Sequence, residues 1–325
     1  MRASRLFGAA AAAVVLMGSF SAFAKEELVS PNAWRDSEID YEHTFSAYSL
    51  DKSAQPTYQP YYAHRLYLMP FWHFNDFFLV KARLVFEQEL TDTADTSTTY
   101  KHEVTLSDLS IDTSFAGVTE PYSGIKFKGG IRWLFPTSKA SQAQTMRVGI
   151  GPGVAVERVF PLLEGLTIGY SARMMFYVNK YRTAQNDSPW VSCGNDTDLA
   201  GCSQFVQSGS RNPWGELRHG PDIKLGIIPK LNFEVMFTMT NDYLYSLDGP
   251  TVLGDDKDVR VRYSQWLLAT LSYDVTDYVG VSLGVSTMYG DLQPDGTYRT
   301  PFINRLSQVY VSLSILIDPI VTKFQ

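Results

Sequence analysis

The chain has 325 residues, with 14% aromatic and 19% charged side chains, a mean hydropathy of −0.12 and a formal net charge of −6. This acidic balance argues against a nucleic-acid partner, because proteins that bind nucleic acids present a basic face. The same figures fit a soluble exported protein as well as a membrane barrel, so composition does not decide between these classes.

The first 24 residues have the three parts of a secretory signal peptide. Arg2 and Arg5 are basic, an apolar run covers residues 6–17, and Ala-Phe-Ala at 22–24 is a small-x-small cleavage pattern. The run is too short for a membrane-spanning helix, which needs roughly 20 apolar residues. We predict that the exported chain begins at Lys25. Because Arg2 and Arg5 leave with the signal peptide, the formal net charge of the exported chain is −8 instead of −6.

The remaining chain divides into a short periplasmic segment at 25–39 and an alternating region at 40–325. The alternating segments are roughly 10–16 residues long, which is typical of the strands of a membrane barrel. In residues 77–90, for example, one parity is apolar, with Phe78, Val80, Ala82, Leu84 and Phe86. The other parity is charged, with Lys81, Arg83, Glu87 and Glu89. Each strand therefore separates an apolar environment from a polar one.

One segment changes parity in the middle. In residues 102–115, Val104 and Leu106 share one phase, whereas Leu109, Ile111 and Phe115 share the other. A β-bulge adds one residue to a strand and restores a single face. We therefore predict a bulge near Ser107 and Asp108.

The connections alternate between short and long. Short ones lie near 73–76, 116–121, 161–165, 229–230 and 276–277, and longer ones lie between them. Outer-membrane barrels show this asymmetry, with short periplasmic turns and longer outer loops. The pattern predicts an antiparallel up-and-down transmembrane β-barrel of about twelve strands. The number is ten if the segments at 40–50 and 61–72 are not membrane strands.

A soluble β-sandwich is the alternative fold, because sequence parity does not say which face points inward. Aromatic residues at the segment ends, such as Trp72, Trp133 and Tyr273, favour a barrel with interfacial girdles. With the signal peptide and the turn pattern, residues 40–318 resemble Gram-negative outer-membrane β-barrels in general, without pointing to one family. The resemblance implies location in the outer membrane and contact with its lipid. One departure is that Pro319 interrupts the last strand, and Gln325 follows Phe324.

Sequence motifs for catalysis, cofactors and metals are weak. His219, on the predicted lipid-facing parity, has no serine at a matching position. The acidic run at 255–258 does not match a calcium loop, and no CxxC pair or metal-type cluster exists. We predict no catalytic residues, no metal site and no cofactor. Cys193 and Cys202 predict a disulfide in the longest outer loop.

The predicted inner face carries charges of both signs, and these separate along the chain. Five cations share the inward parity of consecutive strands and predict a basic stripe, formed by Lys126, Lys128, Arg132, Arg147 and Arg173. Acidic residues concentrate on the two preceding strands and predict an acidic wall, formed by Glu87, Glu89, Asp108 and Asp112. Charges in a low-dielectric wall focus the field onto passing ions.

These features predict a narrow, porin-like channel for small polar or anionic solutes. The alternative is a closed structural or surface-binding barrel, whose interior charges form ion pairs that plug it. A membrane-embedded lipid hydrolase is less favoured. Width does not decide between open and closed, because twelve strands lie between barrels filled by side chains and barrels with wide channels. The sequence does not indicate an oligomeric state.

Overall fold

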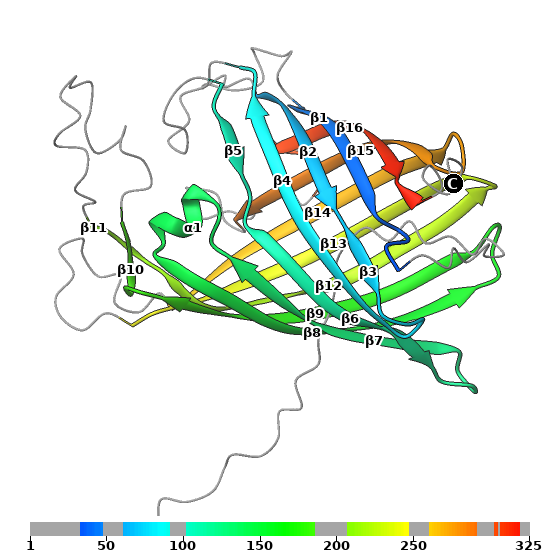
Figure 1. Cartoon of the computed structure of the whole chain (residues 1–325), viewed down its shortest axis with the longest axis horizontal. Coiled ribbons are helices and arrows are strands. Elements are labelled where there is room, and N and C mark those ends of the chain that lie inside the picture. Colours follow the sequence, from blue (N-terminus) through cyan, green and yellow to red (C-terminus); the bar gives the residue numbers. More distant parts are fainter. Residues whose placement is uncertain are drawn as a thin grey trace, which may run out of the picture.

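The computed structural model describes residues 33–47, 61–91, 102–185, 207–246, 260–290, 302–304 and 306–318. The predicted signal peptide at 1–24 and the predicted Cys193–Cys202 disulfide lie outside these residues. The described chain is almost entirely strand and forms a closed antiparallel β-barrel, as predicted (Figure 1). No helix in these ranges is long and apolar enough to cross a membrane.

The elements follow one another as an up-and-down series. In chain order they are β1 (Glu38–Ser46), β2 (Tyr62–Met69), β3 (Phe71–His73), β4 (Phe78–Glu89), β5 (Val104–Leu106), β6 (Leu109–Thr119), β7 (Ile125–Phe135), α1 (Lys139–Ala143), β8 (Met146–Phe160), β9 (Leu166–Asn179), β10 (Thr183–Gln185), β11 (Gln207–Arg211), β12 (Pro213–Ile228), β13 (Leu231–Leu244), β14 (Val261–Asp274), β15 (Val279–Gly290) and β16 (Ser307–Leu316).

Within the described ranges, twelve strands make up the barrel wall, because two of them are interrupted. β2 and β3 both pair with β4, on either side of Pro70, which has no N–H to donate. β5 and β6 form a second interrupted strand. β1 pairs with β16 and closes the barrel, while β10 and β11 form a separate hairpin beyond its rim. The prediction of twelve strands is confirmed, and both early segments contribute strands.

The predicted bulge near Ser107 and Asp108 is confirmed. Leu106 pairs with Phe86, but Ser110 pairs with Arg83, so this strand carries one extra residue between the two pairs. The alternation of side chains is broken at the start of β8. A register shift lies between Met146 and Val148, and Met146 is buried.

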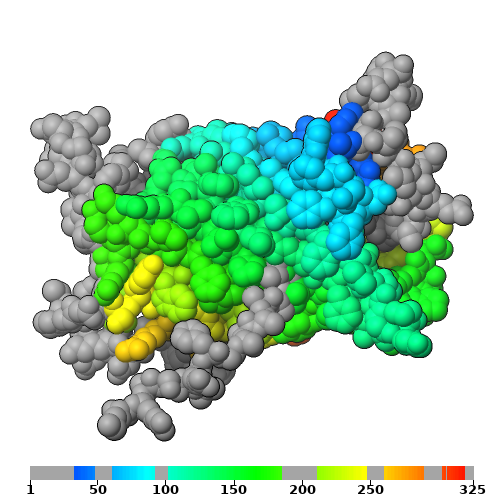
Figure 2. All heavy atoms as spheres, turned by 60° about the horizontal axis from the view of Figure 1, so that its bottom comes forward, coloured from blue at the N-terminus to red at the C-terminus, as the bar shows by residue number. Residues whose placement is uncertain are grey.

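The polarity of the barrel is the reverse of that of a soluble protein. Large apolar side chains such as Leu283, Val178 and Ile168 are exposed on the outer face. Lys81, Asp112 and Thr238 are buried on the inner face. A soluble sandwich would bury the apolar set, whereas a membrane barrel presents it to lipid. Figure 2 shows the outer wall over the cyan and green strands as a continuous surface. The sandwich alternative is therefore excluded.

The two ends of the barrel differ. Described turns of two to five residues, 74–77, 120–124, 161–165, 229–230 and 275–278, join strands at one end. In the 120–124 turn, the hydroxyl and N–H of Ser123 and the N–H of Tyr122 donate to the Glu120 carboxylate and lower its pKa. α1 and the β10–β11 hairpin lie at the opposite end (Figure 1). This is the end that the sequence assigns to the outer loops.

Candidate functional site

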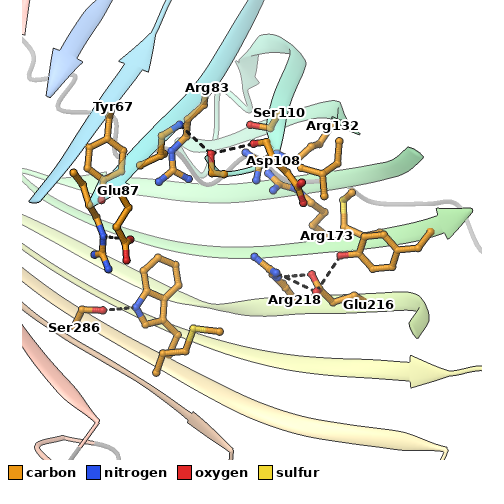
Figure 3. Close-up of a pocket in the computed structure, with 18 of the residues that line it drawn as sticks. Tyr67, Arg83, Glu87, Asp108, Ser110, Arg132, Arg173, Glu216, Arg218 and Ser286 are labelled. Atoms are coloured by element: carbon orange, nitrogen blue, oxygen red, sulfur yellow. Dashed lines mark hydrogen bonds and ion pairs between the residues drawn. The ribbon is translucent and has the colours of Figure 1, made fainter. Parts of the chain in front are cut away.

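A cavity of about 710 Å³ lies inside the barrel. Its lining comes from strands on all sides of the wall, so it is part of the barrel lumen. Its charged lining residues are Arg65, Arg83, Arg132, Arg173, Arg218, Glu87, Asp108 and Glu216. Figure 3 shows arginines from β4, β7, β9 and β12 projecting into this space. Five arginines and three carboxylates give the lining an excess of positive charge.

Arg132 forms the best-defined ion pair of the lumen. Its Nε and Nη2 atoms each donate to one oxygen of Asp112, and both distances are 2.6 Å. The two residues are direct partners in the β6–β7 register, and Lys81 faces Asp112 from β4. Only 1% of Asp112 is exposed, so the carboxylate is removed from solvent and held in a bidentate geometry.

Arg218 and Arg65 are also paired. Arg218 on β12 binds both oxygens of Glu216, with Nη2 lying 3.0 Å from Oε2. Arg65 on β2 donates to Glu87 at 2.5 Å and to Glu42 at 3.1 Å. These contacts neutralise both guanidinium groups locally.

Arg173 and Arg83 are the two lining arginines for which the described chain supplies no carboxylate partner. Arg173 on β9 is only 6% exposed, and its Nη2 atom has no hydrogen-bond partner among the described residues. Its direct cross-strand neighbour is Arg218, so two like charges stand opposite each other. Arg83 on β4 is exposed to the lumen and lies over the Tyr67 ring, 5.3 Å from its centroid.

Glycines on β8 create the space between these arginines. Gly151 faces Arg132 in the register, and Gly153 faces Arg173. A Cβ at Gly151 would lie 1.9 Å from the Met175 sulfur, so no larger residue fits without moving Met175. β8 therefore contributes almost no side-chain bulk to the lumen at this level.

The predicted basic stripe is divided in the structure. Lys128 binds Glu157 at 2.6 Å, and Lys126 is the direct register partner of the same glutamate. Arg132 is held by its pair with Asp112. Arg147 is exposed at the register shift of β8 and is not among the residues that line the cavity. Of the five predicted residues, Arg132 and Arg173 are the ones that reach the cavity.

The predicted acidic wall lies directly beside the basic stripe, because β6 pairs with β7. Asp112 and Glu87 hold arginines, and Glu89 is buried and accepts from Thr91. Asp108 binds the loop that contains α1: Ser138 N–H donates to it at 2.9 Å, and the Ser141 hydroxyl also donates. Each of these four carboxylates is therefore engaged by neighbouring groups.

Three further arginines that line the cavity, Arg65, Arg83 and Arg218, lie outside the predicted basic stripe. A stripe drawn along consecutive strands omits residues that meet across the lumen. On the outer face, His219 lies at 2.7 Å from the Tyr170 hydroxyl, on the lipid-facing side expected from the sequence.

Comparison with solved structures supports the architecture. The COG4313 outer membrane channel from Pseudomonas putida F1 superposes with a TM-score of 0.56 at 8% identity, covering 93% of this chain and 100% of that one. The chain has the outer-membrane barrel fold. The NanC porin matches with a TM-score of 0.43 at 14% identity, over 86% of this chain and 98% of that one. No protein-family model and no curated protein matches the sequence.

Proposed function

We propose that this protein is an outer-membrane channel that passes small solutes and prefers anions. The observation that carries the proposal is the pair of lumen arginines, Arg83 and Arg173, for which the described chain supplies no carboxylate. Burying the Arg173 guanidinium without a partner is costly, and its position opposite Arg218 adds repulsion. Such an arrangement is expected where an anion supplies the missing charge.

The lumen arginines that have carboxylate partners contribute little to the preference for anions. Because Arg132 is held by Asp112 and Arg218 by Glu216, they contribute little net field of their own. The net positive potential of the lumen therefore depends mainly on Arg83 and Arg173. Charges inside a low-dielectric wall concentrate counter-ions and govern ion preference.

The test is the conductance of purified protein in a planar bilayer, with the reversal potential measured in a potassium chloride gradient. We expect discrete steps and a reversal potential of the sign that chloride preference gives. Replacing both residues, Arg83→Gln with Arg173→Gln, should move the reversal potential towards zero or towards cation preference.

The matched control removes two other predicted lumen cations, in Lys128→Gln with Arg147→Gln. Lys128, its partner Glu157 and Arg147 all lie outside the cavity lining, so this control should change selectivity much less. An Arg83 and Arg173 double variant that folds and keeps the wild-type reversal potential would overturn the anion preference. A wild-type protein that inserts but shows no steps would favour a closed barrel.

A further inference from the structure

We propose that the lumen selects organic anions with a planar, apolar body, such as aromatic carboxylates, over polyhydroxylated anions of similar size. This inference rests on the proposed channel and specifies its solute. It follows from what faces the arginines and from which polar groups of the cavity are already engaged.

One wall of the barrel is nearly free of charge. β15 and β16 contain no Lys, Arg, Asp or Glu, and the charged residues of β14 are Arg262 and Asp274, which lie near its ends. In the order of twelve strands, β14 and β15 lie diametrically opposite β5–β6 and β7. The neutral wall therefore faces the side of the lumen that carries Arg132 and, on the adjoining β4, Arg83.

The neutral wall presents large apolar side chains to the cavity. Trp266, Met288 and Leu306 line it from this side, beside the uncharged polar residues Ser286 and Gln308. The indole N–H of Trp266 donates to the Ser286 hydroxyl at 2.8 Å, which fixes the ring within the lumen. A fixed aromatic ring offers a planar contact surface to a solute at little cost in conformational entropy.

Most neutral hydroxyl groups in the cavity are already used within the protein. The Tyr67 hydroxyl donates to Glu42 at 3.3 Å, and the Tyr177 hydroxyl donates to Glu216 at 3.1 Å. The Ser286 hydroxyl accepts from Trp266. A sugar acid that enters must give up water from its hydroxyl groups, and it finds few free partners in return.

An aromatic carboxylate finds a partner in the cavity for each of its two parts. Its carboxylate can accept two parallel hydrogen bonds from a guanidinium such as Arg83. Its ring has no hydroxyl groups to desolvate and can pack against Trp266 or Met288. The cavity thus offers cations on one side and an apolar surface on the other, which matches an anion with a flat hydrocarbon body.

The experiment compares two probes on the same channel. Single-channel chloride current is recorded in planar bilayers while sodium benzoate or sodium gluconate is added to one side at equal concentration. We expect benzoate to interrupt or reduce the chloride current in a concentration-dependent manner. Gluconate, which carries the same charge, should need a clearly higher concentration for the same effect.

Three tryptophan variants identify the apolar contact. Trp266→Ala should weaken the benzoate block about two- to tenfold, the range expected for one aromatic contact. Trp266→Phe keeps a ring but loses the bond to Ser286, and it should retain most of the block. Trp133→Ala is the control, because Trp133 is exposed on the outer face of β7 and does not line the cavity. All three should keep the wild-type reversal potential in potassium chloride.

The outcomes separate this inference from the proposed function. Anion preference with equal block by benzoate and gluconate would overturn the solute class and leave the anion channel intact. The solute class would also be overturned if Trp266→Ala folds, conducts and is blocked as strongly as the wild type. A wild-type protein that shows no preference for anions would overturn the proposed anion channel itself.

Discussion

The bidentate pair between Arg132 and Asp112 allows a double-mutant cycle that tests the electrostatics of the lumen. The variants are Asp112→Asn, Arg132→Gln and the combination of both. Asp112→Asn keeps the shape of the side chain but leaves Arg132 without a counter-charge. The combined variant removes both charges, so it leaves no uncompensated ion.

The burial of this ion pair determines how much unfolding free energy the variants should lose. Removing one partner of a buried ion pair costs about 3–5 kcal/mol, and a single charge-assisted hydrogen bond contributes about 1.5–3 kcal/mol. The Arg132 side chain is 14% exposed to the lumen, so water compensates part of the loss. We expect each single variant to lose about 2–3 kcal/mol of unfolding free energy. The coupling between the two sites should be about 2 kcal/mol, so the double variant loses less than the sum of the singles.

The assay is reversible urea unfolding of the barrel in lipid vesicles, followed by tryptophan fluorescence. The reversal potential supplies a second readout, because Asp112→Asn exposes the field of Arg132 and should strengthen anion preference. Arg132→Gln should shift the preference in the opposite direction. Additive losses of stability, with no coupling between the sites, would refute the assignment of this pair as a tight ion pair.

Three further predictions concern the loop, the lumen and the cysteines. Asp108→Ala should release the loop that contains α1 from the barrel wall, so proteolysis of that loop in folded protein should become faster. Unchanged proteolysis would mean that the contacts of Asp108 with Ser138 and Ser141 do not hold the loop. Gly151→Leu displaces Met175 into the lumen and should lower single-channel conductance, whereas unchanged conductance would mean that solutes do not pass along β8. The predicted Cys193–Cys202 disulfide should stabilise its loop by about 2–3 kcal/mol, and rapid alkylation of both thiols without reductant would disprove it.

The fold could be predicted from the sequence because alternate residues of each strand face the lipid and the lumen of a membrane barrel, so apolar and polar residues alternate. The bulge at Ser107 and Asp108 was also visible, since it changes the phase of a long strand. The irregularity beside Arg147 was not visible. It lies at the end of a strand, where too few alternating residues remain to reveal the change of phase, and so Arg147 was included in the predicted basic stripe.

The lumen was less predictable than the wall. Parity states which face a side chain occupies, but not its height, and height depends on register between strands. Asp112 and Arg132 are on separate strands of predicted opposite charge, yet the β6–β7 register makes them direct partners. The register also sets Arg173 opposite Arg218. Neither relation follows from residue types alone, because strand stagger depends on the turns and bulges between them.

Closure of the barrel by β1 and β16 has a consequence for how the protein is made. The residues of this seam, such as His43 and Val311, lie 268 positions apart in the sequence. Contacts of this separation form slowly, because the intervening loop must be ordered before they can form. Until the last strand arrives, both edges of the sheet carry unpaired backbone groups that can join another chain. We therefore expect that both edges must be shielded from other chains until β1 and β16 pair.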